Sequence, residues 1–402
     1  MFHSRESLYF TTEAIKSLNA YFARLSSATP RRLGICKDLT SLPFLKTSTW
    51  HPSHGQHQHP NPRRRAIGAF YASRLALGPN THVSVICRSN YAAVSQSGFT
   101  ITSPLYGNYV FVPAHVFANP ADAGAADIAW DYILVSTKAL PDVSDDSEIL
   151  TGLLNSGKEG KGGTAIVLVQ NGLGVEEPYA RRFPGAVVLS AVTVASAVQS
   201  APGVVAHNRW TRISIGPYLR ASSESTASNE KEQAAIERNR AFVGMLRMGG
   251  IKDAEEYSHA KLQMVRWHKI AINAAMNPSA VLSGGSTNNA MATDPEMSIH
   301  LRGVMQEVLD TAPKVLGTPL PAEFASPEAI LRSTQKNTSG SKPSMLLDWE
   351  RGATMELEVI LGNPIRIARE HGLEMPRLQS LYALLRKAQE NRELLRKENS
   401  RL

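Results

Sequence analysis

The sequence of 402 residues contains little cysteine and no long apolar segment. Cys36 and Cys87 are its only cysteines, which are too few and too separated for a disulfide framework or a zinc site. This sparing use of cysteine is typical of a reducing compartment, so we expect the protein in the cytoplasm or, alternatively, in the mitochondrion. No apolar run approaches the roughly 20 residues that a membrane-spanning helix requires, so we expect no membrane contact.

Acidic residues are scarce at both ends of the chain, and this accounts for the net charge of +8. The excess of Lys and Arg lies in residues 1–65 and 386–402, whereas the body between them is slightly acidic. A nucleic-acid-binding protein would carry its basic residues on the folded body. The charge distribution therefore argues against a nucleic-acid partner.

Residues 1–64 lack a sustained hydrophobic period and are rich in Ser, Thr, His and Pro. Four histidines cluster between His51 and His59 without a carboxylate or cysteine partner, so we expect no metal site there. We predict that this segment is disordered or is wrongly assigned to the protein. Its basic, Ser-containing composition also allows a mitochondrial transit peptide, although Glu6 and Glu13 argue against one.

From Ala66 onward the pattern is typical of a parallel sheet wound with helices. A helix with small residues is followed by three apolar strands, HVSVICRS, DYILVSTKA and AIVLVQNGLG, each of which ends in polar residues. From about Ser258 the pattern predicts helices only. We therefore predict an α/β fold, with a Rossmann-type sheet domain at residues 65–257, an all-helical domain at 258–385 and a charged, solvated helical tail at 386–402.

The first strand of this sheet is missing from the expected place. The residues before Ala66, GQHQHPNPR, are polar and contain two prolines, so they cannot form a buried parallel strand. The segment Arg31–Cys36, RRLGIC, is a poor substitute because it is short and contains a glycine. We predict that the first strand has been lost or is replaced by another segment.

One helix carries polar residues suited to chemistry. Lys269, Asn273 and Asn277 recur every four residues and therefore share one helical face, while the other faces are apolar. We expect Pro278 to interrupt this helix after about Met276. An amine can protonate a carbonyl oxygen and two amides can hold substrate oxygens. Alternatively, the lysine reaches solvent and the amides bridge neighbouring helices.

Together with a second motif downstream, this helix makes the sequence resemble the ketopantoate reductase (2-dehydropantoate 2-reductase) family. The resemblance extends from about Ala66 to Leu385. The family pattern Lys-x3-Asn-x3-Asn-Pro is matched from Lys269 to Pro278, and Ser-Met-Leu followed by Thr-x-Glu is matched downstream. The resemblance implies NADPH-dependent reduction of 2-dehydropantoate to (R)-pantoate in pantothenate biosynthesis. The alternatives are another NAD(P)-dependent 2-oxo acid reductase and an inactive remnant without a phosphate-binding loop. A homodimer is a possible assembly.

The resemblance also assigns roles to single residues. A helix lysine acts as the general acid, and a downstream glutamate orients it or nearby groups. Amides and a hydroxyl hold the substrate, one of the amides at Asn288 because Thr287 stands where the family places an asparagine. The predicted catalytic residues are Lys269 and Glu356, and the predicted substrate-binding residues are Asn273, Asn277, Ser344 and Asn288.

Cofactor contacts are predicted at three strand ends and in the first helix. Arg88 suits the 2′-phosphate of NADP, unless it simply ends a strand at the surface. Lys138 and Asn171 match family positions that contact the cofactor, and the glycines after Asn171 permit a tight turn. Of the glycine-rich phosphate loop only Gly68 is present, because arginines occupy the first two glycine positions, 63 and 65.

Overall fold

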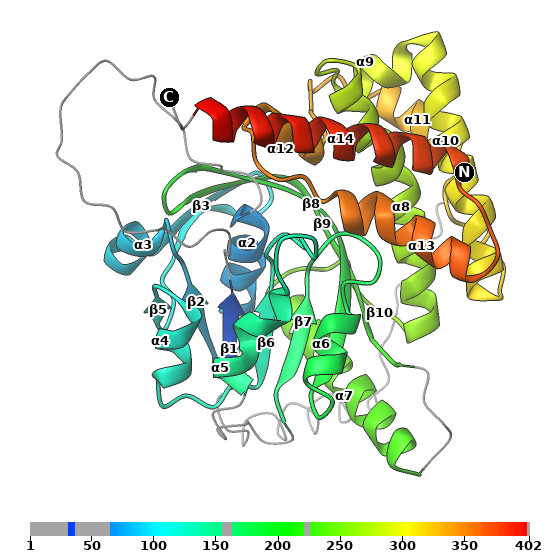
Figure 1. Ribbon diagram of the computed structural model, residues 1–402. Coiled ribbons are helices and arrows are strands. Elements are labelled where there is room, and N and C mark those ends of the chain that lie inside the picture. Colours follow the sequence, from blue (N-terminus) through cyan, green and yellow to red (C-terminus); the bar gives the residue numbers. More distant parts are fainter. Residues whose placement is uncertain (1–30, 37–64, 155–162, 221–225, 400–402) are drawn as a thin grey trace, which may run out of the picture.

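The computed structural model describes residues 31–36, 65–154, 163–220 and 226–399. A twisted sheet with helices on both faces forms one domain, and a helical domain lies across one end of this sheet (Figure 1). The predicted fold class is therefore confirmed. The strands are β1 Arg31–Cys36, β2 Thr81–Ile86, β3 Phe99–Ser103, β4 Gly107–Phe111, β5 Val116–Phe117, β6 Tyr132–Val135, β7 Ala165–Leu168, β8 Val187–Ala201, β9 Val204–Pro217 and β10 Ala254–Glu256.

Helices cover both faces of the sheet and make up the domain that follows it. After β10, every element of the described residues is helical. The helices are α2 Arg65–Leu75, α3 Tyr91–Ser97, α4 Pro120–Ala125, η1 Asp146–Leu150, α5 Thr151–Leu154, α6 Glu177–Arg182, α7 Thr226–Met248, α8 His259–Leu282, α9 Asn288–Thr293, α10 Pro295–Leu316, α11 Pro327–Gln335, α12 Ser344–Glu350, η2 Glu358–Gly362, α13 Asn363–Glu370 and α14 Pro376–Asn399.

The strand order is β4-β3-β9-β8-β7-β6-β1-β2-β5, with β10 beside β9. Strand β1 pairs in parallel with β2 and β6, so that Leu33 lies opposite Val83 on one side and Tyr132 on the other. The first strand was predicted to be lost or replaced by another segment, and Arg31–Cys36, which was judged a poor substitute, takes this place. The predictions that the strand is lost and that residues 1–64 stand outside the sheet are therefore wrong for Arg31–Cys36. The rest of residues 1–64, including the histidine cluster, lies outside the described residues.

The glycine that argued against this strand has a packing role. A Cβ atom built on Gly34 would lie 3.3 Å from the Trp130 ring, which is itself 2% exposed. Glycine lets the indole pack directly on the strand backbone. Leu33 is 2% exposed and belongs to the core between the sheet and α2. Ladder hydrogen bonds on both edges and a few well-placed side chains are thus enough for a central strand.

Helix α8 begins after Ser258, whose hydroxyl accepts a hydrogen bond from the Lys261 amide at 3.3 Å. It continues to Leu282, so the predicted interruption at Pro278 is wrong. A proline inside a helix costs about 3 kcal/mol because it removes one backbone hydrogen bond. Burial of the surrounding segment offsets this cost, since Pro278 and the residues on either side of it are buried.

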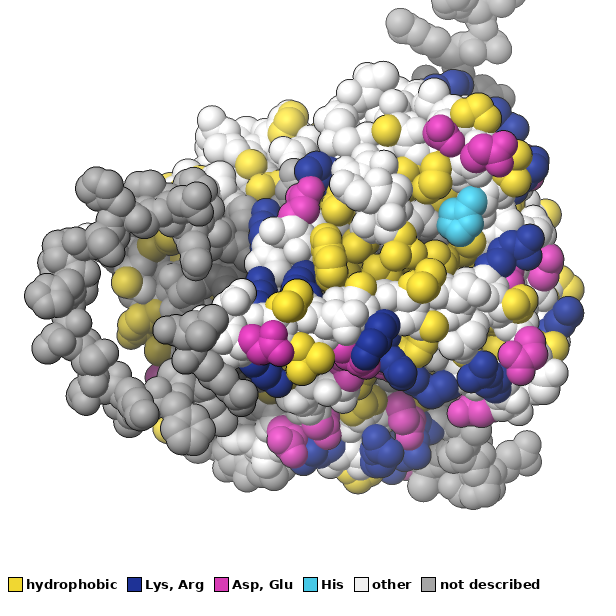
Figure 2. Space-filling view, turned by 45° about the horizontal axis from the view of Figure 1, so that its top comes forward, with side chains coloured by type: hydrophobic (Ala, Val, Ile, Leu, Met, Phe, Trp, Pro, Cys, Tyr) yellow, Lys and Arg dark blue, Asp and Glu magenta, His cyan; other side chains and the backbone are white. Residues whose placement is uncertain are grey.

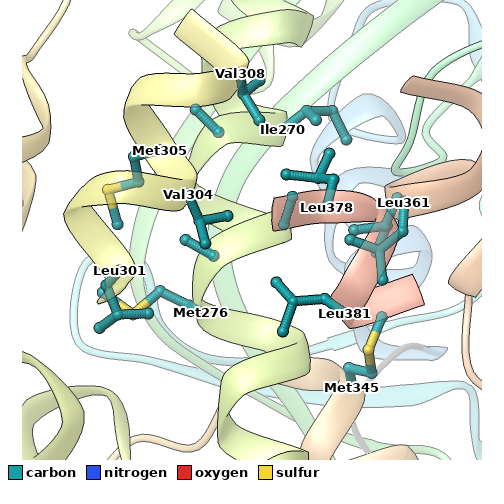
Figure 3. Close-up of a cluster of buried hydrophobic side chains, with 14 of the residues drawn as sticks. Ile270, Met276, Leu301, Val304, Met305, Val308, Met345, Leu361, Leu378 and Leu381 are labelled. Atoms are coloured by element: carbon teal, nitrogen blue, oxygen red, sulfur yellow. The ribbon is translucent and has the colours of Figure 1, made fainter. Parts of the chain in front are cut away.

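Apolar residues on α8 face α10 and α14. Figure 3 shows Ile270 and Met276 of α8 opposite Val304 of α10 and Leu378 of α14, all within one buried cluster. Each such side chain contributes about 1.5–3 kcal/mol when it is fully buried. The helix is therefore fixed against its own domain, while another side of it contacts β8 and β9.

The last part of the chain packs more closely than predicted. The chain after Pro343 forms α12, the π turn η2 and α13. Helix α14 contacts this region, since the Met355 amide donates to the Gln389 side chain at 2.8 Å. Arg392 donates to the carbonyl oxygen of Trp349 at 2.9 Å. The prediction of a solvated tail is therefore wrong at Gln389 and Arg392, whereas residues 393–399 are exposed.

The surface view gives one face of the molecule. Hydrophobic side chains gather near the centre of this face, and charged side chains of both signs surround them (Figure 2). Within the described residues, no helix is long and apolar enough to cross a membrane. In the same part of the chain, no group of three or more His, Cys, Asp or Glu residues is arranged to hold a metal ion.

Leu33→Ala tests the place of β1 in the core. We expect a loss of about 2–5 kcal/mol in the free energy of unfolding, because the substitution leaves a cavity beside α2. The control is Leu105→Ala, which removes the same atoms from a side chain that is 64% exposed and should change stability by less than about 0.5 kcal/mol. Denaturant unfolding measures both. Equal effects would contradict a core position for β1.

Candidate active site

Lys269 lies where α8 meets the carboxyl ends of the parallel strands. Its Nζ donates to Asn171 Oδ1 at 2.9 Å and to the carbonyl oxygen of Thr193 at 2.7 Å. Asn273, one turn further along α8, lines the same cavity of about 10 Å³, which has room for about one water molecule. Asn277, two turns from Lys269, is 3% exposed. Lys269 and Asn273, which were predicted together on one helical face, therefore meet Asn171, which was predicted separately.

The turn at residues 170–174 joins the two domains. Gly172 has a φ of +106° and Gly174 a φ of +70°, so glycine supplies backbone conformations that other residues rarely adopt. A Cβ atom on Gly172 would lie only 2.3 Å from the Cβ of Val359 in η2. The Leu173 amide donates to the Val359 carbonyl oxygen at 2.9 Å. The predicted tight turn is confirmed, and close contact with the helical domain adds a second requirement for glycine.

A buried arginine lies beside this turn. Arg266, one turn before Lys269 on α8, donates to the carbonyl oxygens of Gln170 at 3.1 Å and Gly172 at 2.8 Å. Its Nε lies 3.1 Å from Glu176 Oε1, and both side chains are almost fully buried. The sequence analysis missed this residue because its partners lie about 90 residues earlier in the chain. Its nearness to Lys269 on the helix was the only available signal.

Lys138 and Glu356 lie beside one another at the domain junction. Lys138 Nζ is 2.9 Å from Asp348 Oδ1 and donates to the Thr354 carbonyl oxygen at 2.8 Å. Glu356 is 2% exposed, and its Oε1 accepts from the Ala139 amide at 3.1 Å. The sequence analysis did not single out Asp348, because an acidic residue on a helix is usually exposed. These contacts bind the end of β6 to the helical domain.

Asn288 and Ser344 are connected through the loop before α12. The backbone amide of Asn288 donates to the Ser341 carbonyl oxygen at 3.0 Å, and its side-chain amide lies 3.3 Å from the Ser341 hydroxyl. Ser344 is half-buried three residues further on. Thr287 instead caps α9, since its hydroxyl accepts from the Ala290 amide at 3.3 Å. Of the two neighbouring candidates, Asn288 is the one whose side chain contacts this loop.

The expected cofactor side of the site lies between β1 and β6, where the strand order changes direction. Ser136, directly after β6, has a buried hydroxyl oxygen without a hydrogen-bond partner among the described residues. A buried polar atom needs a partner, so this hydroxyl fits a dinucleotide that crosses the strand ends. Arg88 is half-buried after β2, and Gly68 is buried in the first turn of α2. Residues 37–64, which connect β1 to α2, lie outside the described residues.

A carboxyl group that the sequence did not reveal contacts the same turn. The Gln170 side-chain amide donates to Asp146 Oδ2 at 3.2 Å and to the Thr137 hydroxyl at 3.1 Å. Burial raises the pKa of Asp146 from 3.8 to about 7, opposed by the hydrogen bond from Gln170 and assisted by the charge of Glu356. Asp146 therefore changes its charge near neutral pH, next to the residue that precedes Asn171.

A Rossmann-type sheet whose strand ends meet a helical domain bearing a lysine and an asparagine defines a two-domain NAD(P)-dependent oxidoreductase class. Two family models match the chain. The model described as ketopantoate reductase PanE/ApbA covers residues 66–220, and its C-terminal counterpart covers residues 261–389. The chain belongs to the ketopantoate reductase PanE/ApbA family, whose members are oxidoreductases.

Individual relatives are similar over most of their length. The uncharacterized protein YDL144C of Saccharomyces cerevisiae is 31% identical over 79% of this chain and 90% of its own. The 2-dehydropantoate 2-reductase of a Nostoc species is 24% identical over 80% of this chain and 92% of its own. The crystal structure of 2-dehydropantoate 2-reductase from Methylococcus capsulatus is 29% identical, with a TM-score of 0.68 over 90% of this chain and 97% of that one.

Asp146→Asn should raise the melting temperature by an amount that grows as the pH rises from 5 to 8. Because the folded-state pKa of Asp146 is raised, the folded protein keeps a proton that the unfolded chain releases between about pH 4 and 7. The parent protein therefore loses stability across this interval, whereas an asparagine does not titrate. Melting temperatures of both proteins as a function of pH measure the difference.

Asp145→Asn is the matched control, because the pKa of Asp145 is shifted in the opposite direction. Although partial burial opposes the shift, hydrogen bonds from Ser147 and Arg182 lower the pKa of Asp145. Its stabilising contribution is therefore present at neutral pH and is lost as the pH falls through this lowered value. If the melting temperatures of the parent and Asp146→Asn run parallel from pH 5 to 8, the raised pKa of Asp146 is refuted.

Proposed function

We propose that this protein reduces 2-dehydropantoate to (R)-pantoate with NADPH, a step of pantothenate biosynthesis. The observation that carries the proposal is the meeting of Lys269, Asn171 and Asn273 where the two domains touch. Membership of the ketopantoate reductase family and the similarity to 2-dehydropantoate 2-reductases support it. A homodimer remains a prediction.

The reaction adds a hydride to the keto carbon and a proton to the keto oxygen. Lys269 would give this proton, and its positive charge would stabilise the oxygen as negative charge develops on it. Asn171 and Thr193 accept hydrogen bonds from the amine and so fix its direction. After the proton has left, Lys269 takes another from solvent, so that the enzyme returns to its starting state.

The substrate oxygens would be held by polar groups of the helical domain. Asn273 and Asn277 share the Lys269 face of α8 and would bind the hydroxyl and carbonyl oxygens. Ser344 would donate its hydroxyl to the carboxylate, with Asn288 close by through the Ser341 loop. Glu356 is buried at the same junction and would orient neighbouring groups rather than contact solvent.

The cofactor would lie across the strand ends and supplies the hydride when it is bound. The residues that would hold it are Ser136 and Lys138 after β6, and Asn171 after β7. Arg88 after β2 would bind the 2′-phosphate that distinguishes NADPH from NADH, because a guanidinium can contact a phosphate through two hydrogen bonds. Gly68 would let the first turn of α2 approach the pyrophosphate.

An inactive remnant is the second candidate, and the connection between β1 and α2 favours it. In dinucleotide-binding sheets, a short glycine turn joins the first strand to the first helix. Here 28 residues, numbers 37–64, separate Cys36 from Arg65.

The third candidate, another NAD(P)-dependent 2-oxo acid reductase, would share Lys269 and differ only in the substrates that it accepts. A panel of 2-oxo acids separates it from the first.

Lys269→Ala should lower turnover of 2-dehydropantoate about 10²-fold or more, because a positioned general acid contributes about 10²–10⁴-fold. Oxidation of NADPH, followed by its absorbance, measures the rate. Lys261→Ala is the control, since Lys261 lies on the same helix but forms a surface ion pair with Glu323. Turnover within a few-fold of the parent in the Lys269 variant would remove this lysine from the mechanism.

Replacing residues 37–65 with Gly-Ala-Gly should tighten NADPH binding about 10-fold or more, equivalent to about 1.4 kcal/mol. The new sequence restores Gly-x-Gly-x-x-Gly with Gly68 as its third glycine and connects β1 directly to α2. A backbone free of side chains can approach the pyrophosphate, which arginines at positions 63 and 65 cannot permit. Titration followed by nucleotide fluorescence measures the dissociation constant.

An Ala-Ala-Ala replacement of the same 29 residues separates loop length from the effect of glycine. We expect this control to bind NADPH more weakly than the glycine variant. The same titrations with NADH measure the preference for the 2′-phosphate. If neither the parent nor the glycine variant binds NADPH, the proposed reaction is excluded, and if neither binds NADH as well, the chain is an inactive remnant.

A further inference from the structure

Arg266 and Glu176 form a buried ion pair for which the proposed mechanism has no role. Their side chains are 3% and 2% exposed, and Nε lies 3.1 Å from Oε1. Burying two charges is expensive and is often no more stabilising than apolar packing, so stability alone does not explain such a pair. The contacts of the guanidinium show what it fixes in place.

The guanidinium holds the backbone on both sides of Asn171. Arg266 Nη1 donates to the carbonyl oxygens of Gln170 and Gly172, the residues immediately before and after it. Arg266 Nη2 donates to the carbonyl oxygen of Ala191 at 3.2 Å, and also to the Ser190 hydroxyl. One planar group therefore fixes the turn after β7 and a segment of β8 relative to α8.

Lys269 contacts the same two segments from the next turn of α8. Its amine bonds to Asn171 in the turn and to Thr193 in β8. Residues three apart on a helix are neighbours on its surface, so Arg266 and Lys269 project side by side. The distance from the lysine amine to Asn171 is consequently set by the position that Arg266 gives to the turn.

We propose that Arg266, held by Glu176, is a positioning residue that places Asn171 against Lys269. Glu176 accepts from the Ser190 hydroxyl at 2.5 Å and thereby couples β8 to the pair. A lysine at position 266 would retain the charge, but its single amine cannot bond at once to the carbonyl oxygens of Gln170 and Gly172 and to β8, as the planar guanidinium does. The role in turnover rests on the proposed function, whereas the role in fixing the turn does not.

The test compares Arg266→Lys, Asn171→Ala and the double variant. We expect Arg266→Lys to lower kcat about 10- to 100-fold with less than about 3-fold change in KM, because small misplacements of catalytic groups cost this much. In the Asn171→Ala background, Arg266→Lys should lower kcat by less than about 3-fold, because the side chain that Arg266 positions is no longer present. Equal effects of Arg266→Lys in both backgrounds would overturn the proposal.

Amide hydrogen exchange of residues 169–176 supplies a readout that needs no turnover. We expect exchange in this segment to accelerate about 10-fold or more in Arg266→Lys, whereas exchange in β1, β2 and β6, which Arg266 does not contact, should be unchanged. Unchanged exchange in this segment overturns the proposal even if no substrate is ever reduced. Failure of the parent to reduce any 2-oxo acid, with accelerated exchange in the variant, would instead refute only the proposed function.

Two further variants control for folding and for charge. Glu176→Gln retains the arginine and the shape of its partner, so it should lower kcat and accelerate exchange in the same way but by less. It replaces Arg266→Lys in the test if that variant fails to fold. Arg240→Lys changes an exposed arginine that pairs with Glu256, and it should alter neither kcat nor exchange. If Arg240→Lys accelerates exchange at residues 169–176 as much as Arg266→Lys does, the effect is not specific to Arg266 and the proposal fails.

Discussion

The structure depends on the packing of one five-residue turn, residues 170–174, between α8 and η2. Gly172 has room for no side chain, because Val359 occupies the space where its Cβ would lie. On the other side of the turn, Arg266 holds the backbone through two carbonyl oxygens. The sheet and the helical domain therefore meet at a fixed spacing. Without this contact, Asn171 would have no fixed position beside Lys269, and a general acid must be held in one direction to act at one atom.

The helix motif could be predicted from sequence because its information is local. Lys269, Asn273 and Asn277 follow the helical period, so their shared face required no knowledge of the rest of the fold. The partners of Lys269 were different in kind. Asn171 was predicted as a cofactor contact at a strand end and not as a partner of Lys269. Thr193 was not predicted, because a backbone carbonyl is contributed by position and not by residue type. Residue patterns do not reveal contacts that depend on where a strand passes.

For the first strand, local sequence arguments led to a wrong prediction. RRLGIC was rejected for its length and its glycine, both of which are sound local arguments against a strand. The decisive facts were distant, namely two neighbouring strands that offer parallel ladders and the Trp130 ring that fills the space above Gly34. Pro278 within α8 follows the same logic, because packing of the surrounding helix outweighs one lost hydrogen bond. In both cases tertiary contacts override a local preference, and a central position makes this override strongest.

The domain junction concentrates buried charge at the residues that would do chemistry. Lys138 pairs with Asp348, Arg266 pairs with Glu176, and Glu356 binds the backbone after Lys138. Burying charged groups costs free energy unless their partners are already in place. Each of these contacts joins a residue near the end of a strand to the helical domain. Water could not supply this order, because it would reorganise around every new charge. A substrate oxygen that becomes negative beside Lys269 would therefore meet dipoles and charges that the fold has already oriented, which is how such a site lowers a barrier without moving.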